Sequence, residues 1–294
     1  MKATLALVAL FAVRGLAGQT NQSPSVSQQQ AVAGARMLFD VASIRQSKPG
    51  MPYSERLENG RFTANETLFG YIEFGYNLMP SRDQMDSMLA HLPKWVSTDK
   101  FEIQAVAEGN PTKDQMRLMV RSLLADRFRL QVHTVTAQAA VLALILDKPG
   151  TTGPKLRPHS EGQPCDVQLA SPTPAVGVFP PVCEELMAIP APHGAILVAS
   201  RDSTMEQLAT FVSSLGLLTR PTVDETGLSG RFDFTIEFTP ERKGPPPSAG
   251  VQPDDFQATT LEEALHEQLG LKLKATNAPL DTLTVDHVER PSEN

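Results

Sequence analysis

The sequence is poor in the residues that most often carry nucleic-acid contacts or redox chemistry. It contains two Cys, one Trp and three Tyr in 294 residues, and its 33 acidic residues outnumber its 26 basic ones. An acidic chain with few aromatic residues is a poor nucleic-acid binder, because binding to phosphates depends on Lys and Arg. The GxxxxGK and GxGxxG loops are also missing, which excludes the usual phosphate-binding turns.

Long apolar runs are missing too, apart from one at the N-terminus. Met1–Gly18 contains a charged residue, Lys2, then the apolar segment Ala3–Val13 and the small residues Gly15–Ala17, which is the pattern of a secretory signal. This segment, like every later run, is shorter than the roughly 20 residues that a transmembrane helix needs. We therefore expect a secreted or periplasmic protein with no membrane span after signal cleavage.

Both cysteines fall in one irregular segment, 148–193, which is rich in Pro and Gly. In an oxidising compartment, a disulfide between Cys165 and Cys183 is the default expectation. It would stabilise the folded chain by about 3 kcal/mol if the geometry allows. The alternative is a metal or redox pair, which would need closer spacing or histidine partners.

What the sequence does contain is a supersecondary pattern that occurs twice. From Gly194 to the C-terminus it reads as strand, helix, strand, helix, strand, strand. Thr204 and Thr260 each begin a helix with Glu or Gln close behind, as in a capping box, and Gly216 and Gly270 end these helices. The clearest strand, Arg231–Phe238, alternates apolar and polar residues strictly, so we expect one buried face and one wet face.

The remaining strands of this second copy are predicted at Ala195–Ala199, Leu271–Ala275 and Leu283–Val288.

The stretch from Gly60 to Leu146 follows the same order. Thr67 and Thr112 cap its helices, and its alternating strand begins KFEI where the second copy has RFDF. We interpret this repetition as an internal duplication; the alternative is that any chain of this class shows such runs. The other strands of the first copy are predicted at Gly60–Thr63, Phe128–Val132 and Val141–Leu146, and an earlier strand, Phe39–Ile44, is expected to begin the fold.

The predicted fold class is α+β, with two related units, each a mostly antiparallel sheet with helices packed on one face. Lys48–Asn59 is expected to be a loop. Ser81 is expected to cap an additional helix with Met85, Met88, Leu89 and Leu92 facing inward, and Trp95 to pack against the sheet. The domain boundaries are a signal peptide at 1–18, a disordered leader at 19–36, a first unit at 37–147, a linker at 148–193 and a second unit at 194–294.

No catalytic, cofactor or metal motif is complete, so no such residue is assigned and no cofactor is expected. His266-Glu267 lacks the second histidine of a zinc protease, and the GLSG stretch is followed by Arg231 where a nucleophile elbow needs Gly. The best candidate group is Asp286, His287 and Glu289, at the end of the last strand. These residues could serve a metal or acid–base site, or could be an exposed polar strand end.

A basic stripe is predicted on the second helix of the first copy, where Lys113, Arg117 and Arg121 recur every four residues, followed by Arg127 and Arg129. It could be a solvated face. It could also contact the second copy, which has 15 acidic and 7 basic residues between positions 201 and 289. The acidic residues that it would contact are Glu262, Glu263 and Glu267.

A family likeness extends from about Phe39 to the C-terminus. The segments that carry it are FDVASIRQSKPG, GRFTANETL, KFEIQAVAEGNPTKDQMRLMVRSLLADRFRLQVH, TVDETGLSGRFDFTIEFTPE and LHEQLGLKLKATNAPLDTLTVDHVERPSEN. They resemble the bacterial soil-associated protein family, an exported domain of unknown function. The resemblance implies export and a sensing or binding role, because some members look like extracellular modules joined to antirepressor-type membrane metallopeptidases. The Ser81–Leu92 helix departs from the family pattern, and no site residue carries over.

A second resemblance covers only the strand–helix pattern of Thr204–Val288, as in TLEEALHEQLGLKLK. It is similar to the short N-terminal domain of secretins and TonB-dependent receptors, which implies protein–protein contact. We therefore expect a non-catalytic binding or protein-interaction module of the cell envelope, whose partner is an envelope protein or a small ligand. The alternative is an envelope hydrolase with a site near Asp286, His287 and Glu289.

Overall fold

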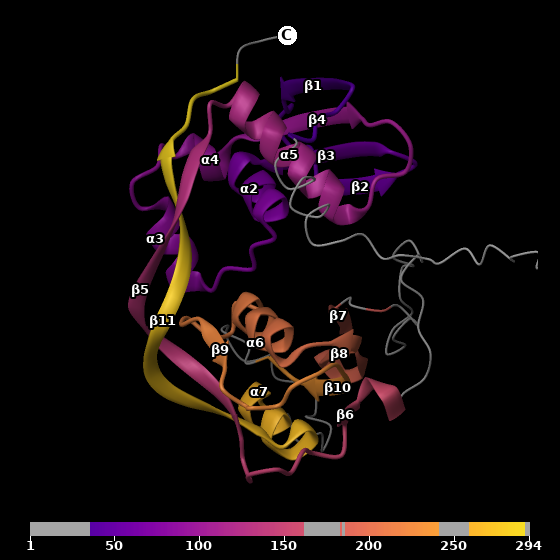
Figure 1. The fold of residues 1–294 in the computed structure, drawn as a ribbon, viewed down its shortest axis with the longest axis vertical. Coiled ribbons are helices and arrows are strands. Elements are labelled where there is room, and N and C mark those ends of the chain that lie inside the picture. Colours follow the sequence, from indigo (N-terminus) through magenta and orange to yellow (C-terminus); the bar gives the residue numbers. More distant parts are fainter. Residues whose placement is uncertain (1–35, 162–182, 184–185, 241–258, 292–294) are drawn as a thin grey trace, which may run out of the picture. The chain divides into compact units, whose positions relative to one another are not determined.

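The computed structural model describes residues 36–161, 183, 186–240 and 259–291 (Figure 1). The predicted signal peptide, the leader up to residue 35 and Cys165 lie outside these residues. Met1–Met37 and Leu38–Asn294 form separate units, and the account below concerns the second of them. Its secondary structure is mixed α+β with mostly antiparallel sheets, as predicted.

The first sheet has the strand order β1-β4-β3-β2, and all its neighbours are antiparallel. Its strands are β1 (Val41–Gln46), β2 (Ser54–Glu58), β3 (Arg61–Thr67) and β4 (Lys100–Val106). The expectation of a loop at Lys48–Asn59 was wrong, because β2 lies inside it. Asn59 and Gly60 both have positive φ, 50° and 73°, which is the Asn-Gly turn that joins two antiparallel strands.

Four helices accompany this sheet: α2 (Leu68–Tyr76), α3 (Arg82–Leu89), α4 (Trp95–Thr98) and α5 (Lys113–Arg127). The predicted caps are confirmed, because Thr67, Ser81 and Thr112 each accept a hydrogen bond from a backbone N–H three residues later. The apolar faces of α2, α4 and α5 and the inner face of the sheet share one core. Its fully buried members include Phe62, Leu68, Tyr71, Ile72, Ile103, Leu124 and Phe128.

Helix α3 differs from the expectation that its apolar residues face a core. None of its residues is buried, and Met85, Met88 and Leu89 are only half-buried. The predicted packing of Trp95 is confirmed, since its ring lies edge-on to Phe101 of β4 at 6.1 Å between centroids. Within the described part of the chain, no helix is long and apolar enough to cross a bilayer.

The second sheet repeats the first, with the strand order β6-β10-β8-β7. Its strands are β6 (Leu156–Pro158), β7 (Met187–Pro190), β8 (Ile196–Ser203) and β10 (Phe232–Phe238), and a short strand, β9 (Thr222–Asp224), lies outside it. Short 3-10 turns occupy His159–Glu161 and Pro192–Gly194. The helices are α6 (Met205–Ser214) and α7 (Leu261–Ala264), which continues as a π-helical turn, Leu265–Leu269.

The predicted start and end residues of the helices in the second copy are confirmed. Thr204 and Thr260 form complete capping boxes, and Gly216 and Gly270 have φ near 70°. One edge hydrogen bond also recurs between the copies. Ser47 donates its N–H to the carbonyl of Lys100, and His159 donates its N–H to the carbonyl of Arg231, both at 2.8 Å. The same strand order and the same edge bond are what a duplicated unit would give.

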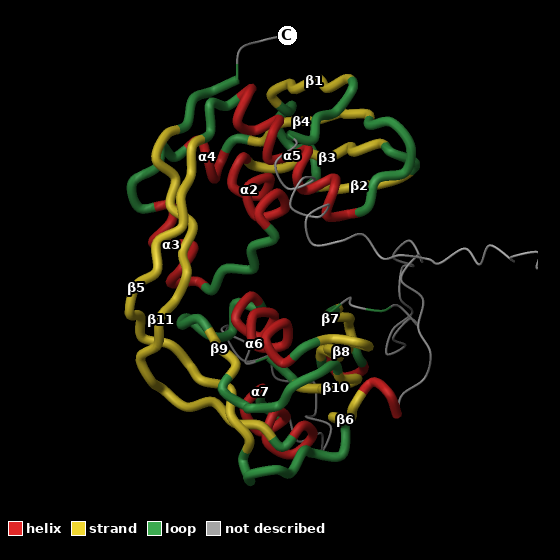
Figure 2. The backbone as a smooth tube through the Cα atoms, viewed as in Figure 1, coloured by secondary structure: helices red, strands yellow, loops and turns green. Residues whose placement is uncertain are grey.

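A third sheet joins the copies, with the order β11-β5-β9. Strand β5 runs over Gln131–Leu146 and β11 over Leu271–His287, and they pair antiparallel along their whole length (Figure 2). We expected two short strands at the end of each copy, and this was wrong: each pair is one continuous strand. The polar middle of each strand lacks the apolar alternation that marks a strand. The backbone N–H and C=O groups of the two middle segments nevertheless pair with each other.

Each end of this β5–β11 ribbon is anchored by contacts with one of the two copies. Leu144 and Leu271 are fully buried in the core of the second copy, together with Leu208, Phe234 and Leu265. At the other end, the N–H of Glu289 donates to the carbonyl of Phe128 at 2.8 Å, and Arg290 pairs with Asp99 at 2.6 Å. The middle of the ribbon is therefore held between two anchored ends.

Candidate functional site

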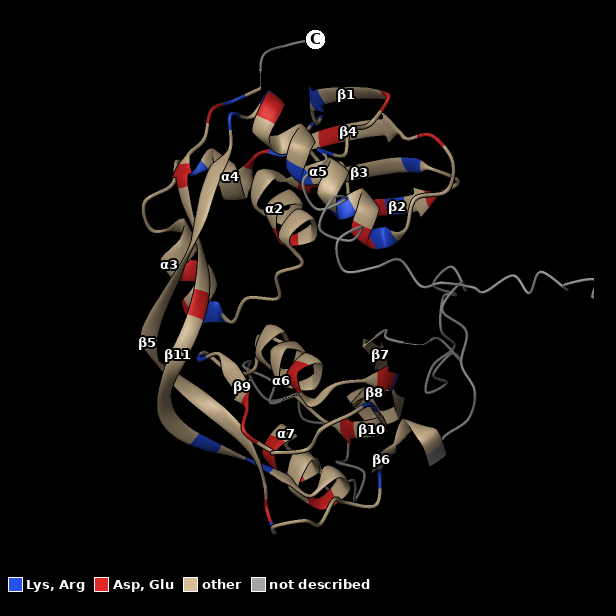
Figure 3. Ribbon diagram, viewed as in Figure 1, with Lys and Arg blue, Asp and Glu red and all other residues tan. Residues whose placement is uncertain are grey.

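The middle of the β5–β11 ribbon is exposed and almost uncharged. From Thr134 to Leu146, strand β5 has no charged residue, and residues 133–138 are all exposed. Val135 is 40% exposed, which is unusual for a large apolar side chain within a strand. On β11 the residues that face 133–138 are 279–284, and the one charged side chain among them is Asp281, which accepts a hydrogen bond from the Thr136 hydroxyl at 2.5 Å. Figure 3 shows the ribbon as mostly uncharged.

The two edges of the ribbon differ in chemistry. Strand β9 pairs with β5 only at residues 142–144, so within the described residues the edge of β5 from Gln131 to Val141 has no strand neighbour. The outer edge of β11 contains Lys272, Lys274 and Pro279, and lysine and proline are the residues that protect strand edges from pairing. The edge of β5 has no such protection, so this edge can accept another strand.

The predicted acid–base group does not converge. The His133 ring lies 2.8 Å from Asp286, across the ribbon, whereas His287 lies 2.8 Å from Glu289 along the chain. All four side chains are about half exposed. Among the described residues, no three His, Cys, Asp or Glu side chains are grouped so that they could hold a metal ion. The structure thus shows two separate surface pairs.

Two arginines of the predicted basic stripe, Arg117 and Arg121, contact residues of the neighbouring helix α2. Arg117 lies over the Phe74 ring at 5.9 Å and pairs with Asp114 at 2.6 Å. Arg121 lies over Tyr76 at 4.6 Å and donates through Nε to the carbonyl of Gly75 at 2.5 Å.

These contacts use both guanidinium groups within the first copy. Arg129 is exposed, with φ of 51°, and Arg127 is half-buried. Glu263 holds the N–H of Thr260 in its own capping box. A contact of this stripe with Glu262, Glu263 or Glu267 of another molecule stays a prediction.

Cys183 forms an isolated bridge with Arg201 of β8. Because Cys165 lies outside the described residues, the Cys165–Cys183 disulfide also stays a prediction.

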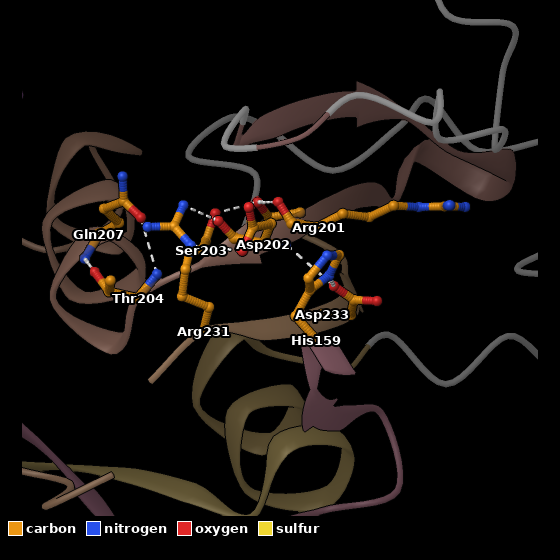
Figure 4. A network of polar contacts seen from close by, with 9 residues as sticks. His159, Arg201, Asp202, Ser203, Thr204, Gln207, Arg231 and Asp233 are labelled. Carbon is orange, nitrogen blue, oxygen red and sulfur yellow. Dashed lines mark hydrogen bonds and ion pairs between the residues drawn. The ribbon is translucent and has the colours of Figure 1, made fainter. Parts of the chain in front are cut away.

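The structure contains one polar network that the sequence did not reveal, at a bulge in β8 (Figure 4). Phe232 pairs with Ser203 but Phe234 pairs with Ser200, so β8 has one more residue than β10 at this point. Asp202 takes up the extra length with φ of 58°. Bulges of this kind redirect side chains and often lie near functional groups.

Asp233 is the centre of this network. Its Oδ1 accepts a hydrogen bond from the N–H of Asp202 at 3.1 Å and lies 2.6 Å from the Nδ1 of His159. Arg231 donates through Nε to the Asp202 carboxylate at 2.5 Å and also to the Asp202 carbonyl. An Asp beside one ring nitrogen fixes the orientation of an imidazole. Within the described residues the ring bonds to Asp233, so the network acts as a clamp between β6 and β8.

The alternation of residues in β10 predicted that the Asp233 side chain would be exposed to solvent. This was wrong, because the side chain is only 7% exposed. His159 bonds to it from a segment that we expected to be linker.

The first copy has a neutral group at the matching place. The Ser47 hydroxyl donates to the Oδ1 of Asn65, and the Asn65 amide donates to the Pro52 carbonyl at 2.5 Å. Strands β3 and β4 pair there without a bulge. The His159–Asp233 pair therefore has no counterpart among the described residues of the first copy, where Ser47 stands at the place of His159.

The first copy contains carboxyl groups with raised pKa values. Burial, with a further contribution from Glu66, raises the pKa of Glu73 to about 7. Burial also raises the pKa of Glu66 and that of the Tyr71 hydroxyl, which donates to the carbonyls of Ala64 and Phe101 at 2.9 and 2.7 Å. These groups make the stability of the first copy sensitive to pH.

Comparison with known proteins gives a family without an assigned activity. Residues 70–288 match the family model described as "Protein of unknown function (DUF3738)". No curated protein and no solved structure matches the chain. The matched region begins in α2 and ends just beyond β11, so it includes the whole ribbon and most of both copies. The chain belongs to the DUF3738 family of proteins of unknown function.

Proposed function

We propose that this protein is an exported, non-catalytic protein-interaction module of the cell envelope, and that it contacts its partner through the β5–β11 ribbon. The observation that carries the proposal is the open β5 edge between Gln131 and Val141, which has no strand neighbour among the described residues and whose residues 133–138 are all exposed. A strand edge offers rows of N–H and C=O groups that an extended segment of another protein can pair with. The resemblance to the short N-terminal domain of secretins and TonB-dependent receptors also favours protein contact.

The separation of the His–carboxylate pairs also supports a module rather than a hydrolase. A hydrolytic site near Asp286 would need His287 or His133 to share one space with further polar groups around a reacting atom. His133–Asp286 and His287–Glu289 are instead two exposed pairs, one across the ribbon and one along the chain. Exposed pairs of this kind contribute little beyond local order.

Export is supported by the pattern of Met1–Gly18, a charged residue followed by an apolar segment and small residues. The location is tested by cell fractionation of the native host with an antibody to this protein. We expect the protein in the periplasm or the medium, shortened at its N-terminus by mass spectrometry. A full-length protein that stays in the cytosol would overturn this part of the proposal.

The interaction is tested by photocrosslinking in the native host. A photoreactive residue replaces Thr134, on the open edge of β5, and in a control strain it replaces Arg56 of β2, whose side chain is 73% exposed. We expect irradiation to give one discrete protein adduct from position 134 and none from position 56. Equal labelling at both positions, or no adduct from position 134, would contradict the assignment of the ribbon as the contact surface.

A further inference from the structure

The open edge of β5 has properties that favour one kind of partner, a second copy of this chain. Alternate residues of an edge strand direct their N–H and C=O groups outward, away from the strand already paired. Along Gln131–Val141 those groups lack a strand neighbour among the described residues, and the side chains of residues 133–138 are exposed. Each copy of the protein presents this same edge.

The edge is self-complementary when two copies run antiparallel about Val135. In that register Thr134 faces Thr136 of the second copy, and the two Val135 side chains face each other. Thr–Thr and apolar pairs directly opposite each other stabilise a sheet. The pairing also covers Val135, the ribbon's large apolar side chain that is 40% exposed.

Charge does not oppose this arrangement. Residues 134–141 carry none, and the nearest ionisable side chain, His133, would face Ala137 and is bonded to Asp286 at 2.8 Å. The opposite edge of the ribbon behaves differently, because Lys272, Lys274 and Pro279 lie along β11. Protection of one edge and not of the other distinguishes β5 as the pairing edge.

We propose that the β5 edges of two copies pair antiparallel over Gln131–Ala139, so that the two ribbons form one continuous sheet across a two-fold axis at Val135. This inference rests on the proposed function and names its partner. Two-fold dimers in which the same surface contacts itself are the commonest oligomers. Across the axis the continuous sheet has the order β11-β5 followed by β5-β11 of the second copy, and β9 stays beside residues 142–144 of β5, outside the paired stretch.

The test measures the association of the purified full chain by sedimentation equilibrium over a concentration series. We expect a monomer–dimer equilibrium for the wild type. Val135→Lys places two ammonium groups opposite each other at the axis, so we expect its dimer to be about tenfold weaker or more and to recover partly in high salt. Val135→Thr keeps a β-branched side chain and should keep the dimer.

The matched control is Thr282→Lys. Thr282 is the residue that pairs with Val135 inside the ribbon, but it lies on β11 and not on the open edge. Its dimer should match that of the wild type, and far-UV circular dichroism and thermal melting confirm that both lysine variants fold. Equal loss of association in both lysine variants, or a wild type that is monomeric at every concentration, would overturn the inference.

The photocrosslinking experiment separates this inference from the proposed function. An adduct from position 134 with the mass of two copies supports both. A discrete adduct with another protein, together with a monomeric wild type, supports the proposed function and rejects the second copy as its partner. The absence of any adduct, with a dimer that Val135→Lys leaves intact, rejects both.

Discussion

Gln138 and Pro279 face each other at the centre of the β5–β11 pairing, and they occupy equivalent places in the two copies. Each lies nine positions beyond the residue with positive φ that follows its helix, Arg129 or Gly270. The register of the ribbon is therefore symmetric about the duplication. This relationship fixes which residues oppose each other along both strands, and it can be tested directly.

The first prediction concerns the register. Ala139 pairs with Ala278, and directly opposed residues in an antiparallel pair have Cα separations that a disulfide can bridge. We expect Ala139→Cys/Ala278→Cys to form this disulfide on mild oxidation and to gain about 2–4 kcal/mol in unfolding free energy, because it closes a long loop. Peptide mapping by mass spectrometry identifies the link. Ala139→Cys/Thr284→Cys, whose residues are not opposed, should not form it.

The second prediction compares the two helix ends. Gly270 has φ of 70°, and a Cβ there would lie 2.6 Å from the Gly153 nitrogen. Gly270→Ala should therefore lower the unfolding free energy by about 2–4 kcal/mol. Arg129 has φ of 51° without being glycine, so Arg129→Gly should raise it by about 1 kcal/mol. Urea denaturation measures both, and the same sign for the two would refute this account of the helix ends.

The third prediction concerns pH. The folded pKa of Glu73 is about 7, above the value of about 4.3 expected in the unfolded chain. The stability associated with protonated Glu73 is present in full below about pH 4.3 and is lost as pH rises through about 7. We expect the unfolding free energy to fall by about 1–2 kcal/mol from pH 5 to pH 8, after allowance for solvent screening of a partly exposed group.

Glu73→Gln should remove this part of the pH dependence, whereas Glu58→Gln, at an exposed carboxyl of β2, should leave it. Denaturant midpoints at four or five pH values measure the slope. A slope that is unchanged by Glu73→Gln would show that another group is responsible.

The fourth prediction concerns the clamp at the β8 bulge. Removing the Asp233 carboxylate leaves the N–H of Asp202 and the His159 ring without their acceptor, and an unsatisfied buried donor costs about 1–3 kcal/mol. Asp233→Ala should cost about 2–3 kcal/mol in urea denaturation. Glu102→Ala, at the matching position of the more exposed first-copy strand, should cost less than about 1 kcal/mol. Equal losses would mean that the network adds nothing to stability.

Local signals predicted much of this fold and little of its long-range arrangement. The Thr and Ser caps followed by Glu or Gln marked four helix starts, because a capping box is complete within four residues, and Thr67 marked a fifth without a box. Strand β2 was missed although Asn59-Gly60 is a strong turn signal, since SERLE has little apolar character. The middle of the ribbon was missed for a related reason: its strands stabilise each other and do not cover a core.

The β8 network could not be predicted from spacing. His159 and Asp233 are 74 residues apart, and their contact depends on the pairing of β6 with β10, which no local pattern specifies. The open edge of β5 could not be predicted either, because it is defined by the pairing of β11 with the opposite edge. The Asp286 group was noticed because its residues are adjacent in sequence, but Asp286 pairs with His133 across the ribbon and His287 with Glu289 along the chain.

The late position of β11 has a consequence for biogenesis. Strand β5 emerges from the ribosome about 140 residues before the segment that pairs with it, and the N–H of Glu289 closes the pairing beside Phe128. Until then, the first half of a nascent chain exposes an unpaired strand. Contacts between such distant segments form slowly. The β5–β11 pairing, and with it the connection between the two copies, therefore forms only after the C-terminal strand has been synthesised.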